Sequence, residues 1–228
     1  MNNLIEIKNV SFNYSKDRKI FDDFSLILDT KENSVLTGKN GSGKTTLSKL
    51  IMGILKPQKG AIKIFGHELS KLSLGQTGEL IGYAYQYPER QLFAMTVMEE
   101  LTFPLIMKGI SPKDAKNEAE EMIRIFELEK VKDSFPFFLS YGEKKRLAIA
   151  SVLMNKPKYL ILDEPTASLD ADRIQLLYKV LDKLNEKKIG ILAISHNENF
   201  IERYGQRIIN LEGGKIRSDT ISENRSSN

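Results

Sequence analysis

Hydrophobic and polar residues alternate along two stretches near the start of the chain. Apolar or aromatic side chains stand at positions 5, 7, 10, 12 and 14, and again at 24, 26 and 28, with mostly polar neighbours between them. A period of two residues places such side chains on one face of an extended strand. The pattern therefore predicts an antiparallel, half-exposed sheet within the first forty residues.

Farther along the chain, short continuous apolar runs replace the alternation. They cover residues 34–37, 159–162 and 190–194, and helical patterns over 45–52, 140–155 and 174–184 lie among them. Apolar strands that alternate with helices are typical of a parallel sheet that is covered on both faces. We therefore predict an α/β fold.

Helical signals dominate the middle of the chain. Ser111 and Pro112 combine an N-cap residue with proline at the first helical position, and apolar residues follow at helical spacing up to Phe126. We expect a helical subdomain over about 87–150, inserted in the α/β body of a single domain that covers 1–216. Residues 217–228 lack apolar periodicity and are expected to form a flexible tail.

The composition is that of a globular protein, with 41% apolar and 28% charged residues. The absence of cysteine excludes disulfides, thiolate catalysis and cysteine-ligated metals, and two histidines leave little for a histidine-rich metal site. No apolar run reaches the roughly 18 residues that cross a bilayer, and the first residues include an acid where a signal peptide would be basic. We therefore expect the chain to stay in the cytoplasm.

The net charge is only mildly positive, at +4 from 34 basic and 30 acidic residues. Such a balance is compatible with a phosphate ligand, an anionic membrane face or nucleic acid. No stretch combines clustered basic residues with interleaved aromatics, so we expect no nucleic-acid partner. The longest basic cluster, Lys144-Lys145-Arg146, lies in a predicted helix and is interpreted as a solvated helix face.

A glycine-rich segment lies between the apolar run at 34–37 and the next helix. Glycines let backbone N–H groups converge on phosphate oxygens, the helix N-terminus adds its dipole, Lys44 would bridge the terminal phosphates, and Thr45 would offer a hydroxyl to Mg²⁺. ATP and Mg²⁺ are the expected ligands, and the alternative is a plain Gly/Ser turn. The segment reads Gly38-Lys39-Asn40-Gly41-Ser42-Gly43-Lys44-Thr45, followed by Thr46, and matches G-x-x-x-x-G-K-[ST].

Two acidic residues, Asp163 and Glu164, follow the apolar run at 159–162. The ends of parallel strands are where α/β sheets bind ligands. Mg²⁺ held through water by Asp163, and an attacking water activated by Glu164 as general base, would account for both carboxylates. The alternative is two acids that merely leave a strand.

The segment Ser140-Tyr141-Gly142-Glu143 has the S-x-x-E spacing of a capping box. Together with the segment 163–170 that follows, it resembles the signature helix, Walker B strand and D-loop of ABC-type ATPases. The resemblance implies a P-loop NTPase with a RecA-like parallel-sheet core, an N-terminal antiparallel β-subdomain and an inserted helical subdomain. It also implies a dimer in which each signature acts on the partner's ATP. The D-loop residues would be Ser168, Leu169 and Asp170.

The same resemblance gives roles to Tyr14, Gln86 and His196. Tyr14 would stack on adenine, Gln86 would reach Mg²⁺ and the attacking water, and His196 would be the switch histidine at the γ-phosphate. Tyr14 shares the inward parity of Val10 and Phe12, so a plain core position is its alternative. The expected catalytic residues are thus Glu164, His196 and Gln86, and the expected metal contacts are Thr45, Gln86 and Asp163.

This signature departs from the family's usual Ser-Gly-Gly-Gln at two positions. Tyr141 replaces the first glycine and Glu143 replaces the glutamine. An ionised Glu143 beside a γ-phosphate would repel it, so we predict that its side chain turns back to cap its own helix.

A narrower resemblance concerns residues 86–93, which are similar to the Q-loop of energy-coupling factor importers for vitamins, cobalt or nickel. It implies a peripheral ATPase at the cytoplasmic face of the cell membrane. The implied partners are a second ATPase subunit, identical or paralogous, a transmembrane coupling subunit and a substrate-binding membrane subunit. Leu92 and Phe93 would contact the coupling subunit or else belong to the core of the helical subdomain. A soluble ABC-type ATPase and a small P-loop phosphotransferase are the alternative functions.

Overall fold

The computed structural model describes residues 4–15 and 18–221. The strands are β1 (Leu4–Ser15), β2 (Arg18–Asp29), β3 (Ser34–Thr37), β4 (Lys59–Ile64), β5 (His67–Glu68), β6 (Ile81–Ala84), β7 (Tyr159–Asp163), β8 (Ile191–Ile194), β9 (Arg207–Glu212) and β10 (Lys215–Ile221). The helices are α1 (Lys44–Ile51), α2 (Leu74–Leu80), α3 (Val97–Met107), α4 (Pro112–Ile125), α5 (Tyr141–Met154), α6 (Ala171–Glu186) and α7 (Glu198–Tyr204). Short 3-10 turns cover Leu69–Lys71, Pro88–Arg90, Glu129–Val131 and Pro136–Phe138.

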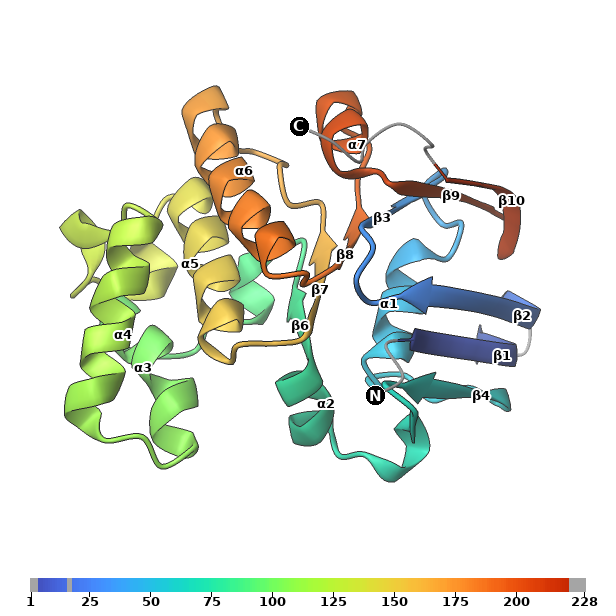
Figure 1. The fold of residues 1–228 in the computed structure, drawn as a ribbon, viewed down its shortest axis with the longest axis horizontal. Helices are drawn as coiled ribbons and strands as arrows, with labels where there is room; N and C mark the ends of the chain where they lie inside the picture. Colours follow the sequence, from blue (N-terminus) through green and yellow to red (C-terminus); the bar gives the residue numbers. More distant parts are fainter. Residues whose placement is uncertain (1–3, 16–17, 222–228) are drawn as a thin grey trace.

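An antiparallel sheet in the order β2-β1-β4-β5 forms one end of the molecule (Figure 1). Its inward side chains include Ile5, Ile7 and Leu28, and the β1–β2 register pairs Ile5 with Leu28. Polar residues of β1 such as Lys8 and Asn9 point to solvent. The half-exposed antiparallel sheet predicted from the alternation is confirmed.

The second sheet has the order β10-β9-β3-β8-β7-β6 and is parallel except for β10. All residues of β7 and β8 are buried, as the continuous apolar runs predicted, and so are those of β6, a strand that was not predicted from the sequence. Helix α1 lies between this sheet and the antiparallel sheet, and the three share one hydrophobic cluster. Helices α5, α6 and α7 contribute to a second cluster with the other face of the parallel sheet. The predicted α/β fold with a parallel sheet covered on both faces is confirmed.

The helices α3 and α4 stand at the opposite end of the molecule from the antiparallel sheet, against α5 (Figure 1). Ser111 caps α4 and Pro112 begins it, so the predicted helix start is confirmed. The stretch 87–150 contains α3, α4 and most of α5, while its bounds as a subdomain stay a prediction. Within residues 4–15 and 18–221, no helix combines the length and apolarity that crossing a membrane requires.

The expectation of a tail that starts at residue 217 is wrong for residues 217–221. They belong to β10, which pairs with β9 through a turn at Gly213 and Gly214, both with positive φ. The pairing depends on main-chain hydrogen bonds, and nearly all side chains of β10 are exposed. The strand therefore shows no alternation of apolar and polar residues in the sequence. The rest of the expected tail, 222–228, lies outside the described residues.

Candidate nucleotide-binding site

The glycine-rich segment turns the chain from β3 into α1. Gly38, Gly41 and Gly43 have φ values of 131°, 81° and 109°, which side-chain-bearing residues rarely adopt. A Cβ atom on Gly43 would also approach Cζ of Phe21 to 2.8 Å. Glycine is therefore required where the loop passes under the antiparallel sheet and α1 begins.

Two polar groups of this loop fit a phosphate ligand. The Ser42 hydroxyl is buried and has no hydrogen-bond partner within the described part of the chain. The Lys44 ammonium donates to the main-chain oxygens of Gly38 at 2.5 Å and Lys39 at 3.0 Å, and burial lowers its pKa. A buried hydroxyl without a partner and a desolvated cation at a helix N-terminus both favour an anion.

Oxygen atoms suited to Mg²⁺ lie beside the loop. The Thr45 hydroxyl donates to Oδ2 of Asp163 at 3.3 Å, and the Tyr83 hydroxyl donates to the same oxygen at 3.4 Å. Burial raises the pKa of Asp163. No cluster of three or more His, Asp or Glu residues that could hold a metal ion occurs in the stretches 4–15 and 18–221. The donor set thus fits a hard cation that takes its remaining ligands from phosphate and water.

Glu164 faces His196 across the same site. The Glu164 Oε1 and His196 Nε2 atoms are 3.7 Å apart, and the main-chain N–H of Glu164 donates to Ile194 at 2.9 Å. Glu164 has a positive φ of 49°, and burial raises the pKa of its carboxyl. A carboxylate with a raised pKa is a stronger base, which suits proton abstraction from water.

The predicted adenine-contacting residue is not part of the core. Tyr14 is 49% exposed, packs edge-on against Phe12, and shares a hydrogen bond of 3.2 Å between its hydroxyl and that of Thr46. It lines a cavity of about 240 Å³ above the loop, which overturns the plain core alternative. The predicted residues that this cavity brings together are Tyr14, Asn40, Gly41, Gly43, Lys44, Thr45, Thr46, Gln86, Asp163, Glu164 and His196.

The signature and D-loop residues do not line this cavity. Ser140 is the N-cap of α5, and the Glu143 carboxylate accepts its main-chain N–H at 2.9 Å and its hydroxyl at 2.6 Å. The predicted capping role of Glu143 is confirmed, and the Ser140 hydrogen bond lowers its pKa. Leu169 lies beside Gly142, since a Cβ there would be 3.7 Å from Cδ2 of Leu169. Ser168 is exposed with φ 62°, and Asp170 caps α6.

The interpretation of Lys144-Lys145-Arg146 as a solvated helix face is wrong. Lys145 is only 1% exposed and Arg146 is 6% exposed. Burial lowers the pKa of Lys145 to about 8, which leaves it mostly protonated at neutral pH. Helix α5 packs on several sides, and its buried cations donate to main-chain oxygens. The unbroken apolar run 147–150 was a signal of such a helix, because a helix that is apolar all round is buried.

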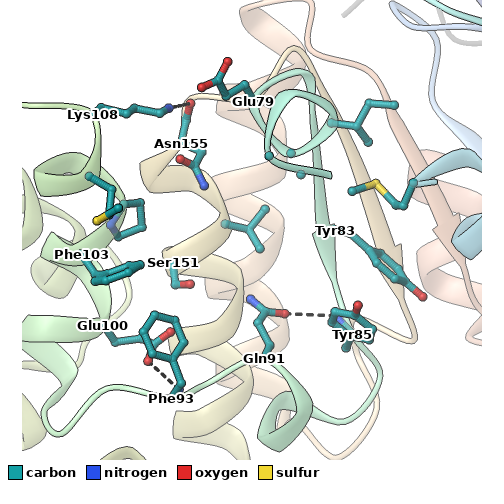
Figure 2. A pocket seen from close by; sticks show the side chains of 18 of the residues that line it. Glu79, Tyr83, Tyr85, Gln91, Phe93, Glu100, Phe103, Lys108, Ser151 and Asn155 are labelled. Atoms are coloured by element: carbon teal, nitrogen blue, oxygen red, sulfur yellow. Dashed lines mark hydrogen bonds between the residues drawn. The ribbon is translucent and has the colours of Figure 1, made fainter. Parts of the chain in front are cut away.

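A second cavity, of about 470 Å³, lies between α2, β6, α3 and α5. Phe93 and Phe103 pack edge-on at its rim (Figure 2) and are 60% and 44% exposed. Leu92, in contrast, is buried in the core that α3 and α4 share. The predicted pair is thus divided: Leu92 is core and Phe93 is surface. The buried carboxylate of Glu100 accepts the main-chain N–H groups of Phe93 and Ala94, each at 2.9 Å. We name this cavity and its rim the groove.

Sequence comparison places the chain among ABC transporters, whose family pattern matches residues 21–167. A Pyrococcus furiosus protein named for ATP binding in an ABC transporter is 33% identical over 93% of this chain and 82% of that protein. A similarly named protein of Caldanaerobacter subterraneus subsp. tengcongensis is 35% identical over 93% of this chain. The chain spans only 37% of that relative's length and 38% of the length of one from Bacillus cereus.

Solved structures give the same result. A dimeric ATP-binding cassette in a post-hydrolysis state with ADP and Pi aligns with a TM-score of 0.86 at 28% identity, covering 95% of this chain and 98% of that one. CbiO1 of Clostridium perfringens, described as part of the ABC transporter complex CbiONQ, aligns with a TM-score of 0.83 at 28% identity, covering 97% and 89%. With its phosphate loop, paired carboxylates and two-sheet fold, the chain belongs to the ABC transporter family, as one of its ATPase domains.

Proposed function

We propose that this chain hydrolyses Mg–ATP in a dimer at the cytoplasmic face of the cell membrane and energises an importer of the energy-coupling factor type. The observation that carries the hydrolytic part is the cavity in which Lys44, Thr45, Gln86, Glu164 and His196 meet. A micronutrient, a vitamin or a cobalt or nickel ion, is the proposed cargo, on the strength of the Q-loop resemblance alone.

The residues of the cavity divide the chemistry among them. Glu164 takes a proton from the attacking water, and His196 beside it contacts the γ-phosphate. Lys44 exchanges its main-chain acceptors at Gly38 and Lys39 for phosphate oxygens. Mg²⁺, held by Thr45 and Asp163 with Gln86 nearby, would neutralise charge on the phosphates.

The position of the signature supports a dimer. Ser140 and Gly142 stand outside the chain's own cavity, and Gly142 lies beside Leu169 of the D-loop. A serine at a helix N-terminus can bind an anion. Ser140 does not line the nucleotide cavity of its own chain. The anion we assign to it is the ATP of a second subunit, identical or paralogous, and the dimeric cassette that aligns with this chain supports that arrangement.

The groove supports a membrane partner. Its rim exposes Phe93, Phe103 and Met107, and an apolar helix end of a transmembrane subunit has the chemistry to cover them. A substrate-binding membrane subunit would complete the importer. The similarity to CbiO1, which is part of a transporter complex, favours this function over a soluble ABC-type ATPase.

Purification of the tagged chain from native membranes in mild detergent, with mass spectrometry of what it retains, tests the transport part. We expect a polytopic subunit together with a small substrate-binding membrane protein. Phe93→Ser should release both, whereas Ile27→Ser, which changes an exposed apolar residue on β2 far from the groove, should release neither. An active ATPase that retains no membrane protein would leave the soluble alternative.

A further inference from the structure

Two side chains of α5 donate hydrogen bonds to one carbonyl of the Q-loop. The Tyr141 hydroxyl donates to the main-chain oxygen of Gln86 at 2.8 Å, and the Lys145 ammonium donates to the same oxygen at 3.1 Å. Residues four apart lie on one face of an α-helix, so both donors reach the carbonyl from the same side of α5.

Lys145 extends this contact to the ends of two neighbouring strands. Its ammonium also donates to the main-chain oxygens of Tyr85 at 3.2 Å and Asp163 at 3.1 Å. Tyr85 and Gln86 directly follow β6, and Asp163 ends β7, which pairs with β6 in the parallel sheet. A lysine has three donors, and they meet the main-chain oxygens of Gln86 and Asp163, which line the nucleotide cavity, and of Tyr85, which precedes Gln86.

We propose that Tyr141 and Lys145 are positioning residues that clamp Gln86 to the signature helix of the same chain. A shift of α5, whose Ser140 acts on the partner's ATP, is then transmitted to the Gln86 that serves this chain's own ATP. The inference rests on the proposed function for the role of Ser140. Tyr141 stands where the family usually has glycine, which has no side chain for such a bond, so this half of the clamp is a property of this sequence.

Arg146 offers a matched comparison on the same helix. It is also a buried cation, but its guanidinium donates to the main-chain oxygens of Phe126 at 2.8 Å and Glu127 at 3.1 Å, just after α4. Loss of either cation removes buried hydrogen bonds and costs stability. Of these two buried cations, Lys145 donates to the Q-loop and Arg146 donates to the segment after α4, so a positioning effect on Gln86 belongs to Lys145 and not to Arg146.

Amide hydrogen exchange of the nucleotide-free chain tests the clamp without ATP. In Lys145→Met, which nearly preserves volume and removes the donors, the amides of 85–87 should exchange at least about tenfold faster than in wild type. Tyr141→Phe should accelerate them about threefold, because it removes one neutral donor. Arg146→Met should accelerate the amide exchange of residues 126–128 and leave the exchange of residues 85–87 unchanged.

Steady-state hydrolysis then tests positioning. We expect kcat of Lys145→Met to fall at least about tenfold, with the Kd for Mg–ATP within about threefold of wild type, because the phosphate loop is untouched. Arg146→Met should keep kcat. Unchanged exchange at 85–87 in both clamp variants would overturn the clamp, and faster exchange with unchanged kcat would overturn its role in hydrolysis.

The two proposals fail in different ways. If the purified wild-type complex hydrolyses no ATP, the proposed function fails while the exchange measurement still tests the clamp. If Lys145→Met does not fold, Tyr141→Phe, which removes a single hydroxyl, carries both measurements.

Discussion

Glu100 is a buried acid whose removal should loosen the groove. It is 1% exposed, lies on the first turn of α3, and accepts the main-chain N–H groups of Ala94 and of Phe93, the latter drawn in Figure 2. Glu100→Ala leaves both donors without that acceptor, and each lost partner costs about 1–3 kcal/mol. We therefore expect the free energy of unfolding to fall by about 2–4 kcal/mol.

Glu100→Gln is the matched control, because the amide oxygen can accept the same two N–H groups. We expect it to change the free energy of unfolding by less than about 1 kcal/mol at pH 7. The chain has no tryptophan, so urea unfolding followed by far-UV circular dichroism is the suitable assay. Equal unfolding free energies for the alanine and glutamine variants would refute the bracing role of this carboxylate.

The same pair of proteins gives a pH test. Burial raises the pKa of Glu100 above its ordinary value of 4.5, so the folded state binds the proton more tightly than the unfolded state. The contribution of this group is full below pH 4.5 and is lost as the pH rises through the raised pKa. Wild type should therefore lose stability relative to Glu100→Gln as the pH rises from 4.5 towards neutrality. A pH-independent difference between the two would contradict the raised pKa.

Three further substitutions test the nucleotide site. Glu164→Gln should lower ATP hydrolysis at least about a hundredfold and yield an ATP-dependent dimer in gel filtration; a monomer that transfers phosphate to an acceptor would contradict the ABC mechanism. Gly43→Ala should abolish binding of a fluorescent ATP analogue, since its Cβ meets Phe21 at 2.8 Å and its φ is 109°; retained binding would show that the loop adapts. Glu143→Gln should change the hydrolysis rate less than about threefold, because glutamine can cap Ser140 as well; a large gain would mean that the carboxylate opposes phosphate.

The nucleotide cavity could be predicted from the sequence because its parts are local. The phosphate loop, the two acids at the end of β7 and the cap of α5 each depend on neighbours within a few residues. The sequence left two interpretations of Tyr14, an adenine contact and a plain core position. The alternation along the strand places it on the same face as Phe12, but its place near the end of β1, beside the loop, leaves it exposed. The simple alternation of inward and outward side chains does not hold at this end of β1, because the β1–β2 register shifts repeatedly.

The roles of Lys145 and Glu100 depend on long-range contacts and left no local signal. Charged side chains are normally solvated, and only the assembled fold shows which backbone groups meet them. Leu92 and Phe93 are neighbours of similar hydrophobicity, yet Leu92 is buried and Phe93 is exposed in the folded chain. The sequence could therefore predict an apolar pair but not which member is available to a partner.

The buried cations of α5 donate hydrogen bonds to main-chain oxygens, which apolar side chains could not do. A methionine at 145 would fill the same space but take the Lys145 donor away from the carbonyls of Tyr85 and Asp163, each at a cost of about 1–3 kcal/mol. The Gln86 carbonyl would keep only its bond from Tyr141. Gln91, which lines the groove, adds a further link. Its amide donates to the main-chain oxygen of Ala148 on α5 at 2.6 Å. It also accepts the N–H of Tyr85 at 3.3 Å (Figure 2). The ends of β6 and β7 at the nucleotide site, and Gln91 in the groove, are thus all hydrogen-bonded to α5. These contacts couple the two sites only if α5 can take up two positions. Opposite exchange patterns in Lys145→Met and Arg146→Met would show that the contacts of α5 with the Q-loop and with the segment after α4 can be released separately.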